Sequence, residues 1–167
     1  MSRPRCRLAF ILLILMAGWA TGASSQAPSQ APQSEHVRQG VRHFELAFYE
    51  LTPKRRDADA AREFDLAKKA FEAEVEARPS SATAHSYLGR IYSLKKDYKK
   101  AAAHYDRLSD IEPLNADACV LAALAYAEDG QTAEARARLE AAKLRTSDPD
   151  ALARIAEYRR KLDSAKR

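Results

Sequence analysis

The chain has 167 residues, of which 46% are hydrophobic and 31% are charged, and only five are glycine. This length leaves room for one domain with an N-terminal extension, and the abundance of Ala, Leu, Glu, Lys and Arg favours a mostly helical protein. The formal net charge is +5, but the first 23 residues contain three arginines and no acid, so 25 basic residues face 23 acidic ones in the remainder. So small an excess argues against a nucleic-acid-binding protein.

The N-terminus has the pattern of an export signal. A basic segment, residues 1–7, precedes an apolar run from Leu8 to Ala20, and small residues follow. The run is shorter than the roughly 20 residues that a membrane span needs. We therefore expect residues 1–23 to be a signal peptide cleaved near Ala23, which predicts an exported protein of the periplasm or cell envelope. The alternative is that the segment stays uncleaved and serves as an N-terminal membrane anchor.

The next segments are a linker and two helices. Residues 24–34 are rich in Ser, Gln, Ala and Pro, and we expect a flexible linker because this composition has almost nothing to bury. The spacing of apolar residues predicts a first helix over about residues 35–50 and a second over about residues 61–77. A long loop, roughly residues 51–61, is expected to join them.

The rest of the chain contains five further helical segments. Ser81, Asp97 and Asn115 stand directly before three of them, where their side chains can cap a helix. Pro149 suits the first turn of the last helix. The predicted helices cover about residues 82–95, 98–111, 116–128, 131–144 and 149–162.

Within this part, the sequence matches itself at a fixed spacing. The corresponding pairs are Gly89 and Ala123, Tyr92 and Tyr126, Ala101 and Ala135, and Tyr105 and Leu139. A repeat of about 34 residues is typical of a solenoid of helix pairs. Gly89 in the middle of a helix costs about 1 kcal/mol relative to Ala, which favours a packing reason for it. We expect that reason to be close contact with another small residue, Ala101, on the second helix of the pair.

The pattern of residues 82–115 resembles the tetratricopeptide repeat. Residues that match the family signature are Leu88, Gly89, Tyr92, Ala101 and Pro113, with Tyr105 as a conservative aromatic match. Residues 116–148 resemble a second, looser copy, and residues 35–81 a degenerate copy with Gly40 at its helix crossing and the long loop as its main departure. The resemblance implies an all-α domain over residues 35–163, a right-handed α-solenoid of antiparallel helix pairs. It would contain about three repeats and a capping helix at residues 149–163.

The resemblance also implies a surface that binds a partner. In this family the first helix of each repeat lines a concave face, which here would carry Val37, Val41 and Phe44, then Thr83, Ser86, Arg90 and Ser93, then Asp117, Val120, Leu124 and Glu128. Apolar side chains on such a face favour the binding of an extended peptide or a helix, and Arg90 would anchor a carboxylate or a carbonyl. The alternative is that Val120 and Leu124 only contact neighbouring helices.

Some family members grip the C-terminal carboxylate of chaperones with Lys and Asn at set positions of this face. Those positions hold Thr83, Tyr87, Asp117 and Leu121 here, so the clamp is absent and binding of cytosolic chaperones is disfavoured.

These features predict a non-enzymatic scaffold or adaptor of the cell envelope that binds a protein or peptide. No nucleic acid, small-molecule substrate, cofactor or metal is expected, and the membrane is expected only through an uncleaved N-terminus. The four histidines lack metal-ligand spacing, and the sequence has no glycine-rich phosphate loop or serine nucleophile elbow. The alternative is a small exported enzyme or a thiol-based sensor that uses Cys119, although its place in the repeat favours a buried packing role.

Overall fold

The computed structural model describes residues 33–164. The expected signal peptide and most of the expected linker lie outside these residues. The described chain forms seven α-helices and one π-helix, with no strand, and none of these helices is long and apolar enough to cross a membrane. The elements are α1 (Glu35–Glu45), η1 (Leu46–Leu51), α2 (Asp57–Ala77), α3 (Ala82–Leu94), α4 (Tyr98–Ile111), α5 (Ala116–Glu128), α6 (Thr132–Leu144) and α7 (Pro149–Ser164).

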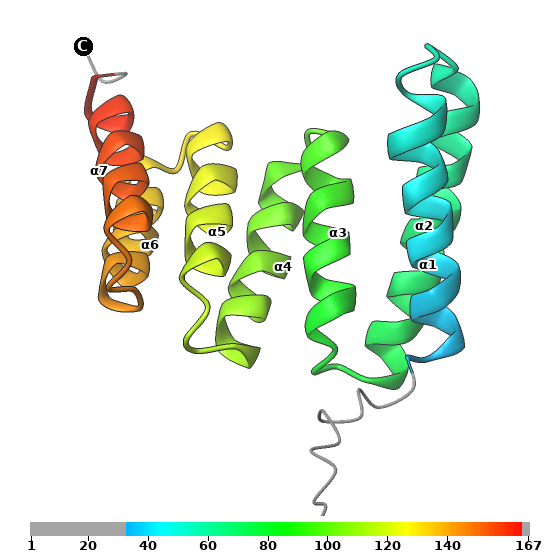
Figure 1. Ribbon diagram of the computed structural model, residues 1–167, viewed down its shortest axis with the longest axis horizontal. Coiled ribbons are helices and arrows are strands. Elements are labelled where there is room, and N and C mark those ends of the chain that lie inside the picture. The colour runs from blue at the N-terminus through cyan, green and yellow to red at the C-terminus, as the bar shows by residue number, and fades with distance from the viewer. Residues whose placement is uncertain (1–32, 165–167) are drawn as a thin grey trace, which may run out of the picture. The chain divides into compact units, whose positions relative to one another are not determined.

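Consecutive helices pack side by side in chain order (Figure 1). α1 packs on α2, α3 on α4 and α5 on α6, and each pair joins the next helix through α2 and α3, α4 and α5, or α6 and α7. In an arrangement of this kind every element depends mainly on its neighbours in the chain. The expected all-α solenoid is therefore confirmed.

The core is a series of three small clusters rather than one centre. Phe71 and Leu88 are buried in the cluster between the first helix pair and α3. Tyr105 is buried in the cluster of α4 and α5, and Leu139 and Ile155 in that of α5, α6 and α7. Burying a large apolar side chain contributes about 1.5–3 kcal/mol, so each cluster stabilises its own part of the array.

Within each helix pair, a small residue on the first helix faces a larger one on the second. The facing pairs are Gly40 and Phe71, Gly89 and Tyr105, and Ala123 and Leu139. A Cβ on Gly40 would lie 2.7 Å from the ring of Phe71, and one on Gly89 would lie 2.5 Å from the ring of Tyr105. Since carbon atoms in contact lie about 3.5–4.0 Å apart, neither position accepts a side chain unless the ring moves. A packing reason for Gly89 is therefore confirmed, but its nearest neighbour across the crossing is the large ring of Tyr105 and not the small Ala101 that the sequence predicts.

The predicted helix caps are also found. Ser81, Asp97 and Asn115 each accept a hydrogen bond from the backbone N–H three residues later, at 3.5, 3.3 and 3.0 Å. These N–H groups belong to the first turn, where a helix offers them no acceptor of its own. α7 begins at Pro149 as expected.

The first helix pair differs from the prediction in its loop. Only residues 52–56 separate the helices, because η1 continues α1 to Leu51 and α2 begins at Asp57. The long loop predicted over residues 51–61 is therefore wrong. The additional residues lengthen the helices instead: α2 has 21 residues where α3 has 13, and Figure 1 shows both helices of this pair extending beyond one end of α3.

A second difference concerns Ser34, which the sequence places in the flexible linker. Its side chain caps α1 by accepting a hydrogen bond from the N–H of Val37 at 3.1 Å, and its hydroxyl donates to the carboxylate of Glu74 on α2. Glu74 is only 1% exposed and also accepts a hydrogen bond from Arg78 at 3.0 Å. The folded domain therefore includes Ser34, because a buried carboxylate needs this donor.

Candidate partner-binding groove

Two adjoining pockets, of about 400 and about 340 Å³, lie between α5 and α7. Leu124 and Tyr158 line both, so the two pockets form one continuous depression, here called the α5–α7 groove. α5 and α7 are not among the closely packed helix pairs of residues 33–164, which leaves the space between them open. The lining residues are Ala116, Asp117, Val120, Leu121, Ala123, Leu124, Ala127 and Glu128 of α5, Ala135 and Leu139 of α6, and Ala151, Arg154, Ile155, Tyr158, Lys161 and Leu162 of α7.

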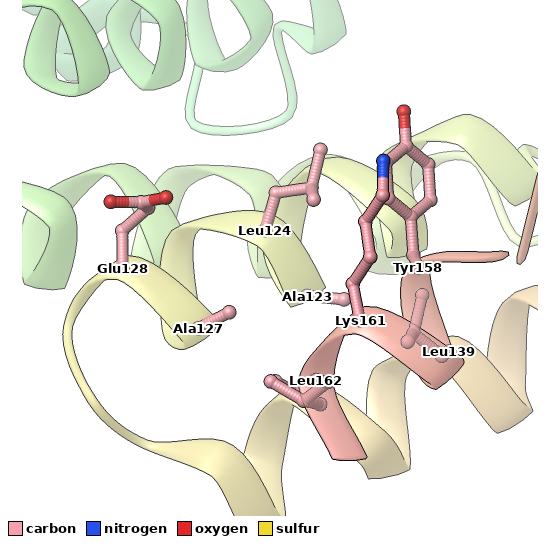
Figure 2. Close-up of a pocket in the computed structure, with 9 residues that line it drawn as sticks. Ala123, Leu124, Ala127, Glu128, Leu139, Tyr158, Lys161 and Leu162 are labelled. Atoms are coloured by element: carbon pink, nitrogen blue, oxygen red, sulfur yellow. The ribbon is translucent and has the colours of Figure 1, made fainter. Parts of the chain in front are cut away.

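The groove has an apolar floor between two charged walls. In Figure 2, Leu124 projects from α5, and Tyr158 and Lys161 lie side by side on α7. The side chain of Leu124 is 36% exposed, so part of its apolar surface is not covered by the rest of the chain. The charged lining residues are Asp117 and Glu128 on α5, and Arg154 and Lys161 on α7.

No ion pair within the described residues joins the two walls. The ion pairs of α7 connect Lys161 with Glu157 of the same helix, at 2.7 Å, and connect α7 with α6. Within the described residues, Asp117, Glu128 and Arg154 make no ion pair, and Lys161 pairs only within its own helix.

The two walls are related by the repeat spacing. Asp117, Val120, Leu121 and Leu124 correspond, one repeat length later, to Ala151, Arg154, Ile155 and Tyr158, and both members of every pair line the same pocket. α7 thus occupies the position of the first helix of a further repeat, which is more than the capping role predicted for it.

Comparison with known proteins identifies the family. Residues 94–157 match the model of a family described as tetratricopeptide repeat. This part of the chain belongs to the tetratricopeptide repeat family. The match runs from the end of α3 into α7, so it includes all of α5 but ends before Tyr158, Lys161 and Leu162 of the α7 wall. No curated protein sequence matches the chain.

Several solved structures share the fold of this chain. The type III secretion translocator chaperone SycD of Yersinia enterocolitica has a TM-score of 0.58 and 18% identity over 75% of this chain and 84% of that one. The first tetratricopeptide domain of Spaghetti (RPAP3), bound to an HSP90 peptide, has a TM-score of 0.55 and 14% identity over 79% and 98%. The N-terminal domain of stress-induced protein-1 from C. elegans has a TM-score of 0.50 and 15% identity over 75% and 98%. At these identities the similarity concerns the fold alone.

In the tetratricopeptide array, the residues predicted on the third repeat come together in the groove. Asp117, Val120, Leu124 and Glu128 all line it. The predicted set lacks Arg154 and Tyr158, because a capping helix is not expected to line a binding surface. The repeat spacing itself would find them, since these two positions lie one repeat length beyond Val120 and Leu124.

The residues predicted on the second repeat are dispersed. Thr83 and Ser86 line a separate pocket of about 250 Å³ beside the end of α4, and Ser93 is half-buried on α3. The guanidinium carbon of Arg90, predicted as an anchor, lies 5.1 Å from the ring centroid of Phe44 and 5.7 Å from that of Tyr87. Arg90 is exposed but already engaged with these two rings.

The predicted lining residues of the first repeat are mostly buried. Val37 is 4% exposed and Phe44 is 1% exposed, and Val41 is half-buried, so the prediction that Val37 and Phe44 face a partner is wrong. α1 contacts α3 directly, and Tyr87 fills the space between them, 5.0 Å from the ring of Phe44 and stacked on that of Phe71 at 4.7 Å. The positions that correspond to Tyr87 in the open groove hold the smaller Leu121 and Ile155.

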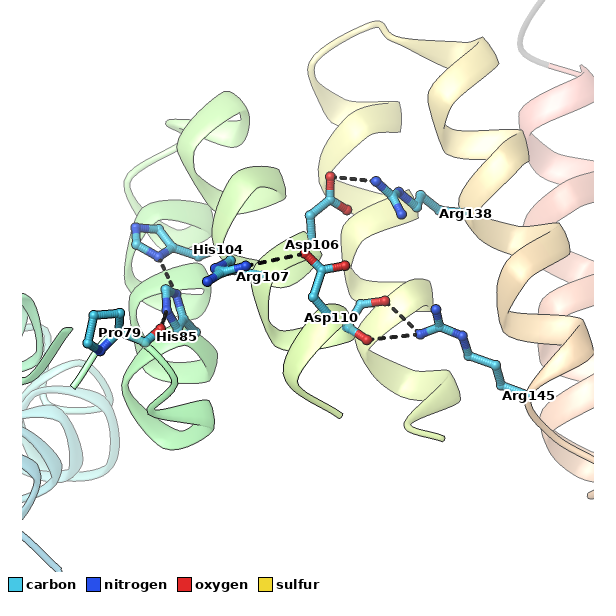
Figure 3. A network of polar contacts seen from close by, with 9 residues as sticks. Pro79, His85, His104, Asp106, Arg107, Asp110, Arg138 and Arg145 are labelled. Atoms are coloured by element: carbon cyan, nitrogen blue, oxygen red, sulfur yellow. Dashed lines mark hydrogen bonds and ion pairs between the residues drawn. The ribbon is translucent and has the colours of Figure 1, made fainter. Parts of the chain in front are cut away.

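Two of the histidines, His85 and His104, are engaged in packing between α3 and α4. The Nδ1 atoms of His85 and His104 lie 3.1 Å apart, and Nε2 of His85 donates to the carbonyl of Pro79 at 3.1 Å (Figure 3). Burial, and next the proximity of His85, lower the pKa of His104 to about 4. Residues 33–164 contain no group of three or more His, Cys, Asp or Glu that could hold a metal ion.

Cys119 lies inside the array, as its place in the repeat predicts. It is 0% exposed and packs in the cluster of Leu139 and Ile155. Its sulfur lies 3.3 Å from the hydroxyl of Ser109, which accepts a hydrogen bond from Arg145 at 2.6 Å. Because a reactive cysteine needs solvent access, this geometry does not favour the thiol-sensor hypothesis.

Proposed function

We propose that this protein is a non-enzymatic scaffold or adaptor that binds a segment of a partner protein in the α5–α7 groove. The observation that carries the proposal is the continuous depression between two helices, with the exposed side chain of Leu124 on its apolar floor and charges on its walls. Two proteins of the same fold support the proposal: SycD is a translocator chaperone, and the domain of Spaghetti is bound to an HSP90 peptide.

The floor can supply affinity. Burying an exposed Leu side chain contributes about 1.5–3 kcal/mol, and Leu124 lies at the junction of the two pockets. Tyr158, opposite it, is an amphipathic ring of the type that often dominates interface energetics. A partner that covers both residues gains from the two pockets at once.

We further propose that binding takes place in the periplasm or cell envelope. The support is the sequence pattern of residues 1–23, a basic segment followed by an apolar run and small residues. Fractionation of a C-terminally tagged chain tests the location, and N-terminal sequencing of the mature form tests cleavage near Ala23. Recovery of the tagged chain from the cytoplasm would contradict this proposal.

Chemical crosslinking and pull-down test the groove. The wild type is expected to capture a partner that Leu124→Asp loses, because a carboxylate on the floor remains without a partner when it is buried. Leu144→Asp is the matched control, since Leu144 is 88% exposed and does not line the groove. Capture of the same proteins by wild type and by both variants would show that the groove is not the binding site.

A further inference from the structure

The chemistry of the two walls specifies the partner more closely. We infer that the segment bound in the α5–α7 groove is an amphipathic α-helix of about three turns, with an acidic edge against α7 and a basic edge against α5. The inference rests on the proposed function, to which it adds the conformation and the charge pattern of the partner.

The apolar floor favours a helix over an extended segment. Val120, Leu124 and Ile155 offer no hydrogen-bonding side-chain atom, and no Asn or Gln lines either pocket. An extended backbone would press N–H and C=O groups against this floor, and each buried group without a partner costs about 1–3 kcal/mol. A helix satisfies these groups internally and presents only side chains.

The length of the groove sets the length of the partner helix. The lining residues include the first and the last residue of α5, which has 13 residues. At 1.5 Å per residue they span about 18 Å, the length of a little more than three helical turns. A partner helix of that length covers both pockets.

The charges of the walls set the edges of the partner helix. Both acidic lining residues, Asp117 and Glu128, are on α5, and both basic ones, Arg154 and Lys161, are on α7. The pair of Lys161 with Glu157 joins two largely exposed side chains, and such a pair contributes little, so Lys161 is free to turn toward a partner. Charges at the rim mainly select the partner, whereas the floor supplies affinity.

Binding of three designed helical peptides, measured by fluorescence anisotropy, tests the inference. All three carry the same leucine stripe over about three turns and differ at their edges: one has Glu along one edge and Lys along the other, one has Lys along both, and one has Glu along both. The mixed-edge peptide is expected to bind roughly tenfold more tightly than the other two, because each of those sets like charges against one wall. Equal binding of all three peptides would overturn the inference.

A charge reversal on α7 tests whether this wall selects the acidic edge of the partner helix. Arg154→Glu is expected to reduce the preference for the mixed-edge peptide several-fold in favour of the all-Lys peptide. Arg160→Glu is the matched control, with the same change of charge on the same helix at an exposed position outside the groove. The inference fails if both variants change the preference equally, or if neither does.

Two further readouts separate this inference from the proposed function. A proline-containing analogue of the mixed-edge peptide cannot form the helix. If this analogue binds the wild type as tightly as the mixed-edge peptide does, and Leu124→Asp abolishes its binding, then the groove is a binding site but its partner is not a helix. Mixed-edge binding that Leu124→Asp leaves unchanged would reject both. Failure of the mixed-edge peptide to bind, together with a wild-type dimer that Leu124→Asp dissociates, would mean that a second copy occupies the groove.

Discussion

At the helix crossings, the residues on the two helices are matched in size. Gly40 and Gly89 face aromatic rings, and the third crossing combines Ala123 with Leu139. A core packed to crystal-like density leaves no room for an added carbon. The distance between the two helix backbones is therefore limited by the combined volume of the two facing side chains. A change on one helix is therefore expected to depend on its partner across the crossing.

Gly89→Ala tests this dependence. The new Cβ would lie 2.5 Å from the ring of Tyr105, and overpacking of this kind costs about 1–3 kcal/mol, against a gain of about 1 kcal/mol in helix propensity. We expect the free energy of unfolding to fall by about 1 kcal/mol in urea titrations, the balance of these two effects. The double variant Gly89→Ala, Tyr105→Leu has the same residue pair as the third crossing, Ala with Leu. Tyr105→Leu should therefore lower the free energy of unfolding less in the Gly89→Ala background than in the wild type. A stabilised Gly89→Ala variant would contradict the explanation.

Glu74 provides a pH-dependent contribution to stability. Burial by itself raises its pKa, but hydrogen bonds from Arg78, Ser34 and Ser81 outweigh burial and hold the pKa below the ordinary value of 4.5. A lowered carboxyl pKa stabilises the folded state above the unfolded pKa, and the contribution is lost as pH falls through the folded pKa.

Glu74→Gln is accordingly expected to destabilise the protein at neutral pH by about 1–3 kcal/mol. The difference from wild type should shrink as the pH falls below 4.5, because the wild-type carboxylate then becomes protonated. Urea titrations at neutral and acidic pH measure both effects. Arg56→Gln is a control at an exposed ion pair, where little change is expected. A difference that is independent of pH would contradict the assignment.

At the scale of elements, a tyrosine hydrogen bond recurs at the junctions between helix pairs. The hydroxyl of Tyr92 on α3 donates to Glu72 on α2 at 3.0 Å, and at the equivalent position of the next repeat that of Tyr126 on α5 donates to Asp106 on α4 at 2.7 Å. Asp106 also accepts a hydrogen bond from Arg138 on α6 at 2.8 Å (Figure 3). The same carboxylate thus connects three consecutive helices.

Removing this hydroxyl is expected to weaken the junction. Tyr126→Phe should lower the free energy of unfolding by about 1–2 kcal/mol, since a hydrogen bond to a charged group is stronger than a neutral one. Tyr49→Phe removes the same atom from a side chain that is 62% exposed and should leave stability nearly unchanged. Equal unfolding midpoints for wild type and Tyr126→Phe would show that water replaces the bond without cost.

At the scale of the whole molecule, α7 closes one end of the core. Ile155 of α7 is packed in the same cluster as Cys119 and Leu139, and Tyr158 and Leu162 lie against it. Because each element of a solenoid relies on its neighbours, loss of the terminal helix removes a cover that no distant part of the chain replaces.

Alkylation of Cys119 by iodoacetamide measures this cover, with mass spectrometry of the peptide that contains Cys119 as the readout. Labelling of the native chain should be slow and should accelerate in urea, because the thiol is 0% exposed and reacts only in opened states. A chain that ends before Pro149 should label at least roughly tenfold faster, since opening of α5 and α6 then costs less free energy. Equal rates for the two chains would show that α7 does not protect the third repeat.

Much of the helical framework is predictable from local patterns. Ser81, Asp97 and Asn115 mark helix starts by their side chains alone, and Gly89 marks a crossing by its cost in a helix. The burial of Phe44 was not predictable in this way, because it depends on Tyr87 from another helix. The role of Ser34 depends likewise on Glu74, which is distant in the chain and lies on α2.

Local sequence patterns are sufficient to predict the helices, their repeat spacing and the close crossings, because caps, periodicity and small residues act over a few neighbouring positions. Which face stays open depends instead on contacts between helices that are distant in the chain. The deciding quantity is the volume of the side chains that lie between the first helices of successive repeats. Tyr87 fills the gap between α1 and α3, whereas the smaller Leu121 and Ile155 leave a groove between α5 and α7.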